Sequence, residues 1–218
     1  MRSVLLLSGG LDSLVAAYAA RGEHPPLLAL TFDYGQRAAP RELETALRVS
    51  ADLDITHRLV KLPWLARLTP ADLADPGSDL SDATDQSVWV PARNAVFIAI
   101  AAAFAEAHDC GAIVCGFNAE EGASFPDNTP EFVARCDAVL ELATQNAPRV
   151  IAPTIHLTKP EIVRLGLAVG APLHFVWSCY GAGPEHCWVC PSCRRLRAAL
   201  QDAGQWQRWS ELRGDAGS

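Results

Sequence analysis

The stretch RSVLLLSGGLDSLVAAYAAR, residues 2–21, runs from an apolar segment through a glycine-containing turn into a helical pattern. Residues 4–7 are continuously apolar, as in strands buried within parallel sheets, and residues 11–18 carry apolar side chains at helical spacing. Gly9 and Gly10 let the backbone approach an anion, and the next helix would offer free N–H groups and the positive end of its dipole. The stretch therefore predicts a strand, a phosphate-binding turn and a helix.

The polar residues of this turn indicate what it binds. The Ser8 and Ser13 hydroxyls can add hydrogen bonds to a phosphate, whereas the Asp12 carboxylate would repel one unless it holds loop amides or Mg²⁺. Asp12 therefore favours a bound metal–nucleotide complex. The order SGGLDS resembles the pyrophosphate loop of the ATP pyrophosphatases and lacks the GK[ST] of the Walker motif. A glycine-rich turn without a ligand is the alternative.

Strand and helix patterns alternate beyond this turn. Strands are predicted at 3–7, 27–32, 56–62, 112–116 and 149–152, and helices at 11–21, 39–52, 92–108, 130–144 and 159–169. The alternation predicts an α/β fold with a parallel sheet flanked by helices on both faces. Ligands of such sheets collect beyond the carboxyl ends of the strands, where Ser8, Asp33 and Gly116 fall.

Residues 63–90 break the alternation, with several prolines and aspartates and no sustained periodicity. We interpret this segment as a lid over the site, with a disordered insertion as the alternative. The residues beyond 214 are expected to fray. The whole chain, 1–218, is expected to form a single domain.

The composition limits the class of partner. The 218 residues are 50% hydrophobic and carry a net charge of −7, a field that repels nucleic acid. The sequence has neither a leader pattern nor an apolar run of bilayer-spanning length. We expect a cytoplasmic protein that acts on a small substrate, with no nucleic-acid partner and no membrane association.

Four of the seven cysteines cluster in a turn-rich segment at about 178–197. They are Cys179, Cys187, Cys190 and Cys193. Four thiolates suit tetrahedral Zn²⁺ and close its coordination shell, so the spacing predicts a structural zinc site. An iron–sulfur cluster and four unliganded thiols are the alternatives. His186 adjoins a ligand but is expected to lie outside the coordination shell.

Three further motifs fall at the predicted ligand edge: FDYGQR at 32–37, VPARN at 90–94 and TKPE at 158–161. The first places an acid and a phenol where α/β proteins bind ribose or adenine, although a polar turn would look the same. Arg93 opens an apolar helix against the helix dipole, which suggests an anionic partner. The third motif reads as a capping box that would aim Lys159 at the phosphate rim, with a solvated lysine as the alternative.

In this order, and with WSCY, the cysteines and Arg194 following, the motifs resemble the 7-cyano-7-deazaguanine synthases of the queuosine pathway. The resemblance implies an adenine-nucleotide α-hydrolase-like, Rossmann-like fold with bound zinc, usually as a homodimer. It also implies an ATP-dependent ligase that converts 7-carboxy-7-deazaguanine and ammonia to 7-cyano-7-deazaguanine through adenylated carboxylate and amide intermediates.

The resemblance and the motif positions together assign roles to residues. ATP and Mg²⁺ would contact Leu7, Ser8, Gly9, Gly10, Leu11, Asp12, Ser13, Asp33 and Lys159. Substrate would contact Tyr34, Gln36, Arg93, Asn94, Glu121 and Asp127. Asp12, Lys159 and Arg93 would be catalytic, the four cysteines would bind zinc, and Arg194 would belong to the adjoining wall of the site.

Two departures from the family pattern bear on these roles. The family typically has an aspartate–aromatic–serine–glycine–tyrosine–proline–aspartate–cysteine run where this chain has EGASFPDN at 121–128. Trp188 and Pro191 also replace the usual residues of the zinc segment. We expect Glu121 and Asp127 to read the substrate base. The alternative functions are a deazaguanine-to-protein ligase, a tRNA sulfur transferase and a zinc-stabilised nucleotide sensor.

Overall fold

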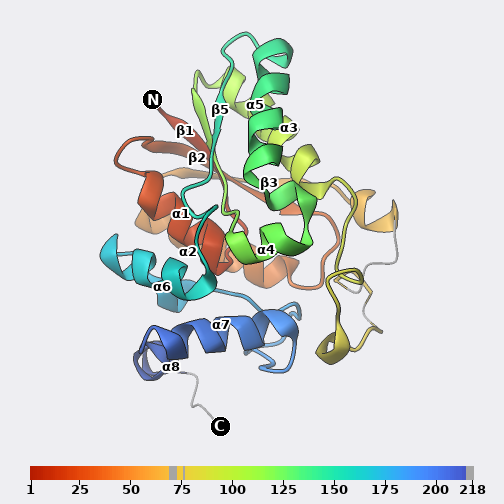
Figure 1. Cartoon of the computed structure of the whole chain (residues 1–218), viewed down its shortest axis with the longest axis vertical. Helices are drawn as coiled ribbons and strands as arrows, with labels where there is room; N and C mark the ends of the chain where they lie inside the picture. Colours follow the sequence, from red (N-terminus) through yellow and green to blue (C-terminus); the bar gives the residue numbers. More distant parts are fainter. Residues whose placement is uncertain (69–72, 76, 215–218) are drawn as a thin grey trace.

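The computed structural model describes residues 1–68, 73–75 and 77–214 (Figure 1). Five parallel strands form one sheet in the order β3-β2-β1-β4-β5, with Val4 of β1 opposite Leu28 of β2 and Ile113 of β4. The strands are β1 Ser3–Leu6, β2 Pro26–Asp33, β3 Thr56–Lys61, β4 Ala112–Val114 and β5 Arg149–Ile151. The helices are α1 Leu11–Ala20, α2 Ala39–Asp52, α3 Arg93–Ala107, α4 Ala119–Ser124, α5 Pro130–Ala143, α6 Lys159–Ala168, α7 Pro191–Asp202 and α8 Trp206–Arg213. The predicted α/β fold is confirmed.

Helices cover both faces of the sheet because its strands alternate between two cores. On one face Leu5 and Val114 pack in a core that includes residues of α1, α2 and α6. On the other face Val4 and Ile113 pack in a core with residues of α3 and α5. Strands buried on both sides read as continuous apolar runs, which is why 4–7 was recognisable in the sequence. Within the described ranges no helix combines the length and hydrophobicity that a bilayer crossing requires.

All ten predicted strands and helices are present, and their bounds differ from the predictions by two residues at most. Three helices were not predicted: α4, α7 and α8. The first is a short helix of six residues after the β4 strand. Of the other two, α7 begins within the cysteine segment, whose prolines and glycines we interpreted as turns, and α8 follows it. Pro191 is in fact the first residue of α7, a position where proline is favoured because no intrahelical N–H is lost.

The C-terminal helices pack against an aromatic cluster of Trp177, Trp188, Trp206, Trp209 and His186. The His186 ring lies 4.6 Å from the Trp177 ring and 4.9 Å from the Trp188 ring, measured between centroids. Its Nε2 accepts a hydrogen bond from the backbone N–H of Ser178, 3.2 Å away. Burial lowers the pKa of His186 to about 3, so the ring is neutral. As expected, His186 does not belong to the cysteine cluster.

The segment 63–90 contributes side chains to the site. Leu73, Val88, Trp89 and Val90 line a cavity at the carboxyl ends of the strands. The segment also holds two single-turn 3-10 helices, Leu65–Leu68 and Leu80–Asp82. Arg37 ties it to the sheet, because its backbone N–H donates to the Leu73 carbonyl and its guanidinium to the Ser78 carbonyl, 2.8 Å away. Residues 69–72 and 76 of the proposed lid, and the tail 215–218 that we expected to fray, lie outside the described residues. Movement of the segment stays a prediction.

Gly116, just beyond β4, is packed against the first turn of α1. A Cβ added here would lie 2.6 Å from the Ser13 Cα, closer than real Cβ contacts permit. We expect Gly116→Ala to reduce the free energy of unfolding by about 1–3 kcal/mol, and hence the melting temperature by several degrees, because the backbone would have to shift. Gly22→Ala is the matched control, since nothing lies within 4 Å of that position. Equal melting temperatures for the two variants would contradict the packing argument.

Candidate functional site

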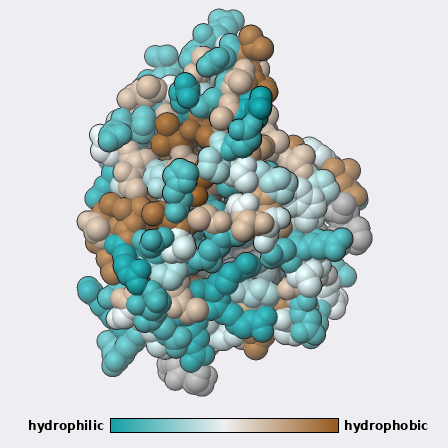
Figure 2. All heavy atoms as spheres, viewed as in Figure 1, coloured by the Kyte–Doolittle hydropathy of each residue, from teal (hydrophilic) through white to brown (hydrophobic). Residues whose placement is uncertain are grey.

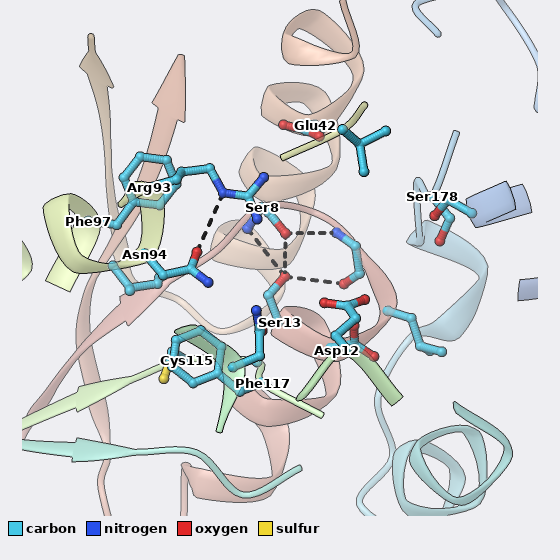
Figure 3. A pocket seen from close by; sticks show the side chains of 18 of the residues that line it. Ser8, Asp12, Ser13, Glu42, Arg93, Asn94, Phe97, Cys115, Phe117 and Ser178 are labelled. Atoms are coloured by element: carbon cyan, nitrogen blue, oxygen red, sulfur yellow. Dashed lines mark hydrogen bonds between the residues drawn. The ribbon is translucent and has the colours of Figure 1, made fainter. Parts of the chain in front are cut away.

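A cavity of about 270 Å³ opens at the carboxyl ends of the strands. Of the residues predicted for the site, it is lined by Leu7, Ser8, Gly10, Leu11, Asp12, Ser13, Tyr34, Arg93, Asn94, Glu121, Asp127 and Lys159. The topology brings them together from β1, β2, α1, α3, α4 and α6 and the segments that adjoin them. Figure 3 shows Ser8, Ser13 and Asp12 on one side of this cavity and Arg93 and Asn94 facing them.

The 8–13 loop is held open by its own hydroxyl groups (Figure 3). The Ser8 backbone N–H donates to Ser13 Oγ over 3.2 Å, and the two hydroxyl oxygens lie 3.0 Å apart. Gly9 has φ +78°, in the left-handed region that favours glycine. Gly10 is the N-cap residue of α1, and no side chain forms a capping hydrogen bond there. The loop thus leaves backbone N–H groups at a helix N-terminus, an arrangement suited to an anion.

Asp12 is the centre of a buried polar network. One of its oxygens, Oδ2, accepts from Lys159 Nζ over 2.5 Å and from Asn118 Nδ2 over 3.2 Å. Lys159 Nζ also donates to Glu121 Oε1, 2.8 Å away. Burial raises the pKa of Asp12 to about 6, although Lys159 opposes this. Burial alone would lower the pKa of Lys159, but the two carboxylates raise it, so the lysine stays charged.

The other oxygen, Oδ1 of Asp12, is buried and has no hydrogen-bond partner within the described part of the chain. A buried carboxylate oxygen without a partner is costly. Because Asp12 lines the cavity, a bound cation could satisfy this oxygen from that side. The donor chemistry of Asp12 therefore fits a hard divalent metal.

The opposite wall of the cavity carries Arg93. Ala92, before it, has φ +55°, a strained conformation that turns the chain into α3. Arg93 Nη1 donates to the Tyr34 hydroxyl over 3.3 Å, and Asn94 Nδ2 donates to the Asp127 carbonyl over 3.2 Å. Although burial alone would lower it, the pKa of Arg93 is raised by Tyr34. The wall thus offers a fixed cation beside amide and carboxylate groups.

Three predicted site residues do not line the cavity: Gly9, Asp33 and Gln36. The Asp33 carboxylate accepts from the Gly35 N–H within its own turn. The Gln36 side chain is buried; its oxygen accepts from the Tyr34 N–H and its nitrogen donates to Phe32 O and Glu42 Oε2. Their roles in ligand contact have no support from this geometry. The prediction that Arg194 lies on the wall is wrong: Arg194 donates to the Ser81 carbonyl, and the next residue, Arg195, lines the cavity.

Sequence reasoning missed five residues that line the cavity, Glu42, Trp89, Phe125, Tyr180 and Arg195, and also Asn118, which contacts Asp12. Trp89 and Phe125 are stacked, with centroids 5.7 Å apart and planes 7° from parallel. Arg195 donates to the Tyr180 hydroxyl over 3.2 Å. Only Asn118 had a local signal, because it follows the β4 strand and its side chain caps α4 by accepting from the Glu121 N–H. The others reach the cavity through tertiary packing.

The four cysteines predicted to bind metal form one cluster. Their sulfur atoms all lie within 4.8 Å of one another, and all but Cys187 are buried. Backbone N–H groups donate to three sulfurs, from Gly181 to Cys179, from Cys190 to Cys187 and from Cys193 to Cys190, over 3.3–3.5 Å. N–H donors of this kind stabilise thiolates, so the cluster is suited to a metal.

This loop at the end of the first strand of a parallel sheet, with a helix N-terminus behind it, is the arrangement of a PP-loop α/β fold. A protein of the same fold is the U34-tRNA thiolase NcsA from Methanococcus maripaludis, with a TM-score of 0.51 and 14% identity over 100% of this chain and 74% of that chain.

The family model for the queuosine biosynthesis protein QueC matches residues 2–204, so the chain belongs to the QueC family. A 7-cyano-7-deazaguanine synthase from Pelotomaculum thermopropionicum is 46% identical over 94% of this chain and 98% of its own. One from Methanothermobacter thermautotrophicus is 45% identical over 94% of this chain and 96% of its own. The family predicted from the motifs is confirmed.

Replacing Cys190 with Ser removes one of the four sulfurs, and we expect the variant to lose its bound metal and melt at a lower temperature. Elemental analysis of the purified protein beside thermal unfolding measures both effects. Cys136→Ser is the control, because Cys136 lies on α5 outside the cluster and should keep one metal ion per chain. A metal-free Cys190→Ser protein with unaltered melting would contradict a structural role for the cluster.

Proposed function

We propose that this QueC-family protein is an ATP-dependent enzyme that converts 7-carboxy-7-deazaguanine and ammonia to 7-cyano-7-deazaguanine, forming carbon–nitrogen bonds in queuosine biosynthesis. The relatives that share about 45% identity over most of the chain carry the name of this synthase. The observation that carries the proposal is the single cavity in which the 8–13 loop, Asp12 and Lys159 face Arg93 and Asn94.

The nucleotide would lie over the 8–13 loop. We assign the loop amides and the Ser8 and Ser13 hydroxyls to its phosphates, with Lys159 reaching them from α6. Asp12 would hold Mg²⁺ through Oδ1, the oxygen that lacks a protein partner. Bound there, Mg²⁺ supplies charge neutralisation for the phosphates.

The substrate would lie against the other wall. A planar deazapurine fits a site with the stacked pair Trp89 and Phe125, since aromatic rings stack on bases. Glu121 and Asp127 would accept hydrogen bonds from the donors of the base, and Arg93 would bind the anionic carboxylate. Asn94 fixes the Asp127 backbone by donating to its carbonyl.

The residues present can support the chemistry of adenylation. A carboxylate is a poor acyl donor, so transfer of AMP to it creates a leaving group that ammonia can displace to give an amide. Adenylation of the amide oxygen by a second ATP then allows loss of AMP and leaves the nitrile. Both steps redistribute charge on phosphates, which Lys159 and the loop amides would stabilise by several kcal/mol, on the order measured for oxyanion sites.

We assign Zn²⁺ to the cysteine cluster. Thiolates that bind zinc at about 2.3 Å in a tetrahedron lie roughly 3.8 Å apart, and the Cys187 and Cys193 sulfurs are 3.9 Å apart. An iron–sulfur cube places each cysteine on a different iron atom, which needs wider spacing. The close spacing therefore favours zinc in a structural role.

The remaining organisation is proposed from the family resemblance. The chain would act as one domain of residues 1–218 with its zinc segment at about 178–197, and as a homodimer. On α5, Val139 is 61% and Leu142 92% exposed. Figure 2 shows the hydrophobic residues of this face as separate patches among hydrophilic ones. None of the seven cysteines of the chain, all of which lie within the described residues, forms a disulfide, which suits the reducing cytoplasm.

A tRNA sulfur transferase would need a reactive cysteine in the cavity. The cysteine there outside the zinc cluster is Cys115, and burial raises the pKa of its thiol well above the usual range. Such a thiol is a poor nucleophile because the thiolate is the reactive form. The observation disfavours sulfur transfer.

The proposal predicts that the protein releases AMP and pyrophosphate from ATP only when 7-carboxy-7-deazaguanine is present, and forms the nitrile when ammonia is added. Asp12→Asn should lower the rate of AMP formation by about 10²–10³, because the variant loses the charge that organises metal and phosphates. Its zinc content should stay close to wild type, whereas its melting temperature should fall, because the variant breaks the buried ion pair with Lys159. Mass spectrometry of the base measures nitrile formation, and chromatography of the nucleotides measures AMP release.

Asp202→Asn is the control, because Asp202 pairs with Arg164 on the surface, outside the cavity, and should leave turnover unchanged. Wild-type turnover in Asp12→Asn would overturn the assignment of the loop. AMP formation with deazaguanine attached to a protein, in place of free nitrile, would instead support the ligase alternative.

A further inference from the structure

Glu42 places a carboxylate in the cavity that the reaction as described does not use. It lies in the first turn of α2 and lines the cavity with Ser8 and Ser178 (Figure 3). The Glu42 backbone carbonyl lies beside Gly9, so the residue flanks the 8–13 loop. No motif in the sequence marked Glu42, because its place in the cavity depends on how α2 packs beside the loop.

Only one oxygen of this carboxylate is committed to the protein. Oε2 accepts from Gln36 Nε2 over 2.7 Å, and Gln36 is itself fixed by the Tyr34 N–H and the Phe32 carbonyl. Oε1 of Glu42 accepts no hydrogen bond from any residue that the structure describes. The charged and titratable groups near Glu42 are Arg93, Asp33 and Tyr34. Burial raises the pKa of Glu42 to about 7, although Gln36 and Arg93 oppose this.

A free carboxylate beside a phosphate site calls for a cation between them. A carboxylate next to bound ATP is unfavourable unless a positive group separates the two charges, as in other anion sites. Within the described chain, Arg93 is the cation whose charge acts on Glu42, and Lys159 pairs with Asp12 and Glu121. Since Arg93 and Lys159 are assigned to the substrate carboxylate and to the phosphates, a further cation beside Oε1 of Glu42 would have to come from a ligand.

We propose that Glu42 binds the ammonium ion in the cavity and removes the proton that converts it into the attacking ammonia. This inference rests on the proposed function, which consumes ammonia. Ammonium transfers one proton from nitrogen to Glu42 Oε1, and the freed lone pair forms the C–N bond. As the acyl–AMP bond breaks, the nitrogen gives a second proton to the departing AMP phosphate, which leaves the neutral amide. The proton on Glu42 leaves to solvent after the product is released.

The position of Glu42 favours the nucleophile over the substrate base as its ligand. The adenylate carries the α phosphate, which in ATP is joined to the pyrophosphate group that the 8–13 loop would hold. A group that delivers the nucleophile to the acyl carbon therefore has to lie in the same cavity as the loop, and Glu42 does, since it lines the cavity with Ser8. The stacked rings of Trp89 and Phe125, which suit the base, belong to other segments of the cavity. Gln36 is then a positioning residue that acts through Glu42.

The test is the pH dependence of kcat/KM for total ammonium, from about pH 6 to about pH 9, in wild type and Glu42→Gln. Below about pH 7 Glu42 is protonated and cannot hold ammonium, so wild-type kcat/KM rises with pH and levels off above that value. Glu42→Gln has no such carboxylate and depends on free ammonia. Its kcat/KM should be roughly 10- to 100-fold lower near pH 7 and should keep climbing towards the pKa of ammonium.

Pyrophosphate exchange with ATP and 7-carboxy-7-deazaguanine, without ammonia, separates this inference from the proposed function. No exchange in the wild type would refute the proposed function itself. Normal exchange in Glu42→Gln together with the changed ammonium profile supports the inference. A wild-type ammonium profile in this variant, or a change confined to the KM of the deazaguanine or of ATP, overturns it.

Glu44→Gln is the matched control on the same helix. Glu44 pairs with Arg41 and Arg48 on the surface, so this variant should keep the wild-type profile. If Glu42→Gln fails to fold, Glu42→Asp provides the second variant. Its shorter carboxylate should raise the KM for ammonium while keeping the plateau above neutral pH, and an unchanged KM would overturn the inference.

Discussion

The ion pair between Asp12 and Lys159 is the interaction on which the arrangement of the site depends. It joins the N-terminus of α1 to that of α6, 147 residues further along the chain, and Asn118 adds the start of α4. Burying two charges is costly, and the cost is offset only when geometry and further hydrogen bonds are good. Here the further hydrogen bonds are the one from Lys159 to Glu121 and the one by which Asn118 caps α4. The N-termini of α1, α4 and α6 therefore hold one another in position, and displacing any one of them would break the contacts of the other two.

The sheet follows from the sequence because local rules decide it. Apolar runs buried on both faces give the strands, and the helix 39–52 was predicted with its observed bounds because its pattern is strongly amphipathic. The 8–13 loop and the four cysteines were found because each set is contiguous or regularly spaced. Short elements such as α4, and helices that begin within a proline- and cysteine-rich segment such as α7, carry no comparable local signal.

The side chains of the cavity wall were harder to predict because tertiary packing selects them. FDYGQR was placed correctly at the end of a strand, yet the Gln36 side chain turns inward to Glu42 and the Arg37 side chain turns outward to the Asp75 and Ser78 carbonyls. Adjacent arginines, Arg194 and Arg195, differ in the same way, since one helical step of about 100° separates the cavity from Ser81. A motif predicts the position of the backbone, but the local rotation of the chain about its axis decides which side chains point into the cavity.

The aromatic cluster around His186 gives the protein a built-in optical reporter. Four of the six tryptophans, Trp177, Trp188, Trp206 and Trp209, lie in it, and Trp188 stands between Cys187 and Cys190 of the metal cluster. Trp177 adjoins Ser178 and lines the cavity as well. Indole emission depends on the polarity and quenching groups around the ring. The intrinsic fluorescence of the chain is thus dominated by one region, where occupancy of the cysteines and occupancy of the cavity are both expected to change the signal.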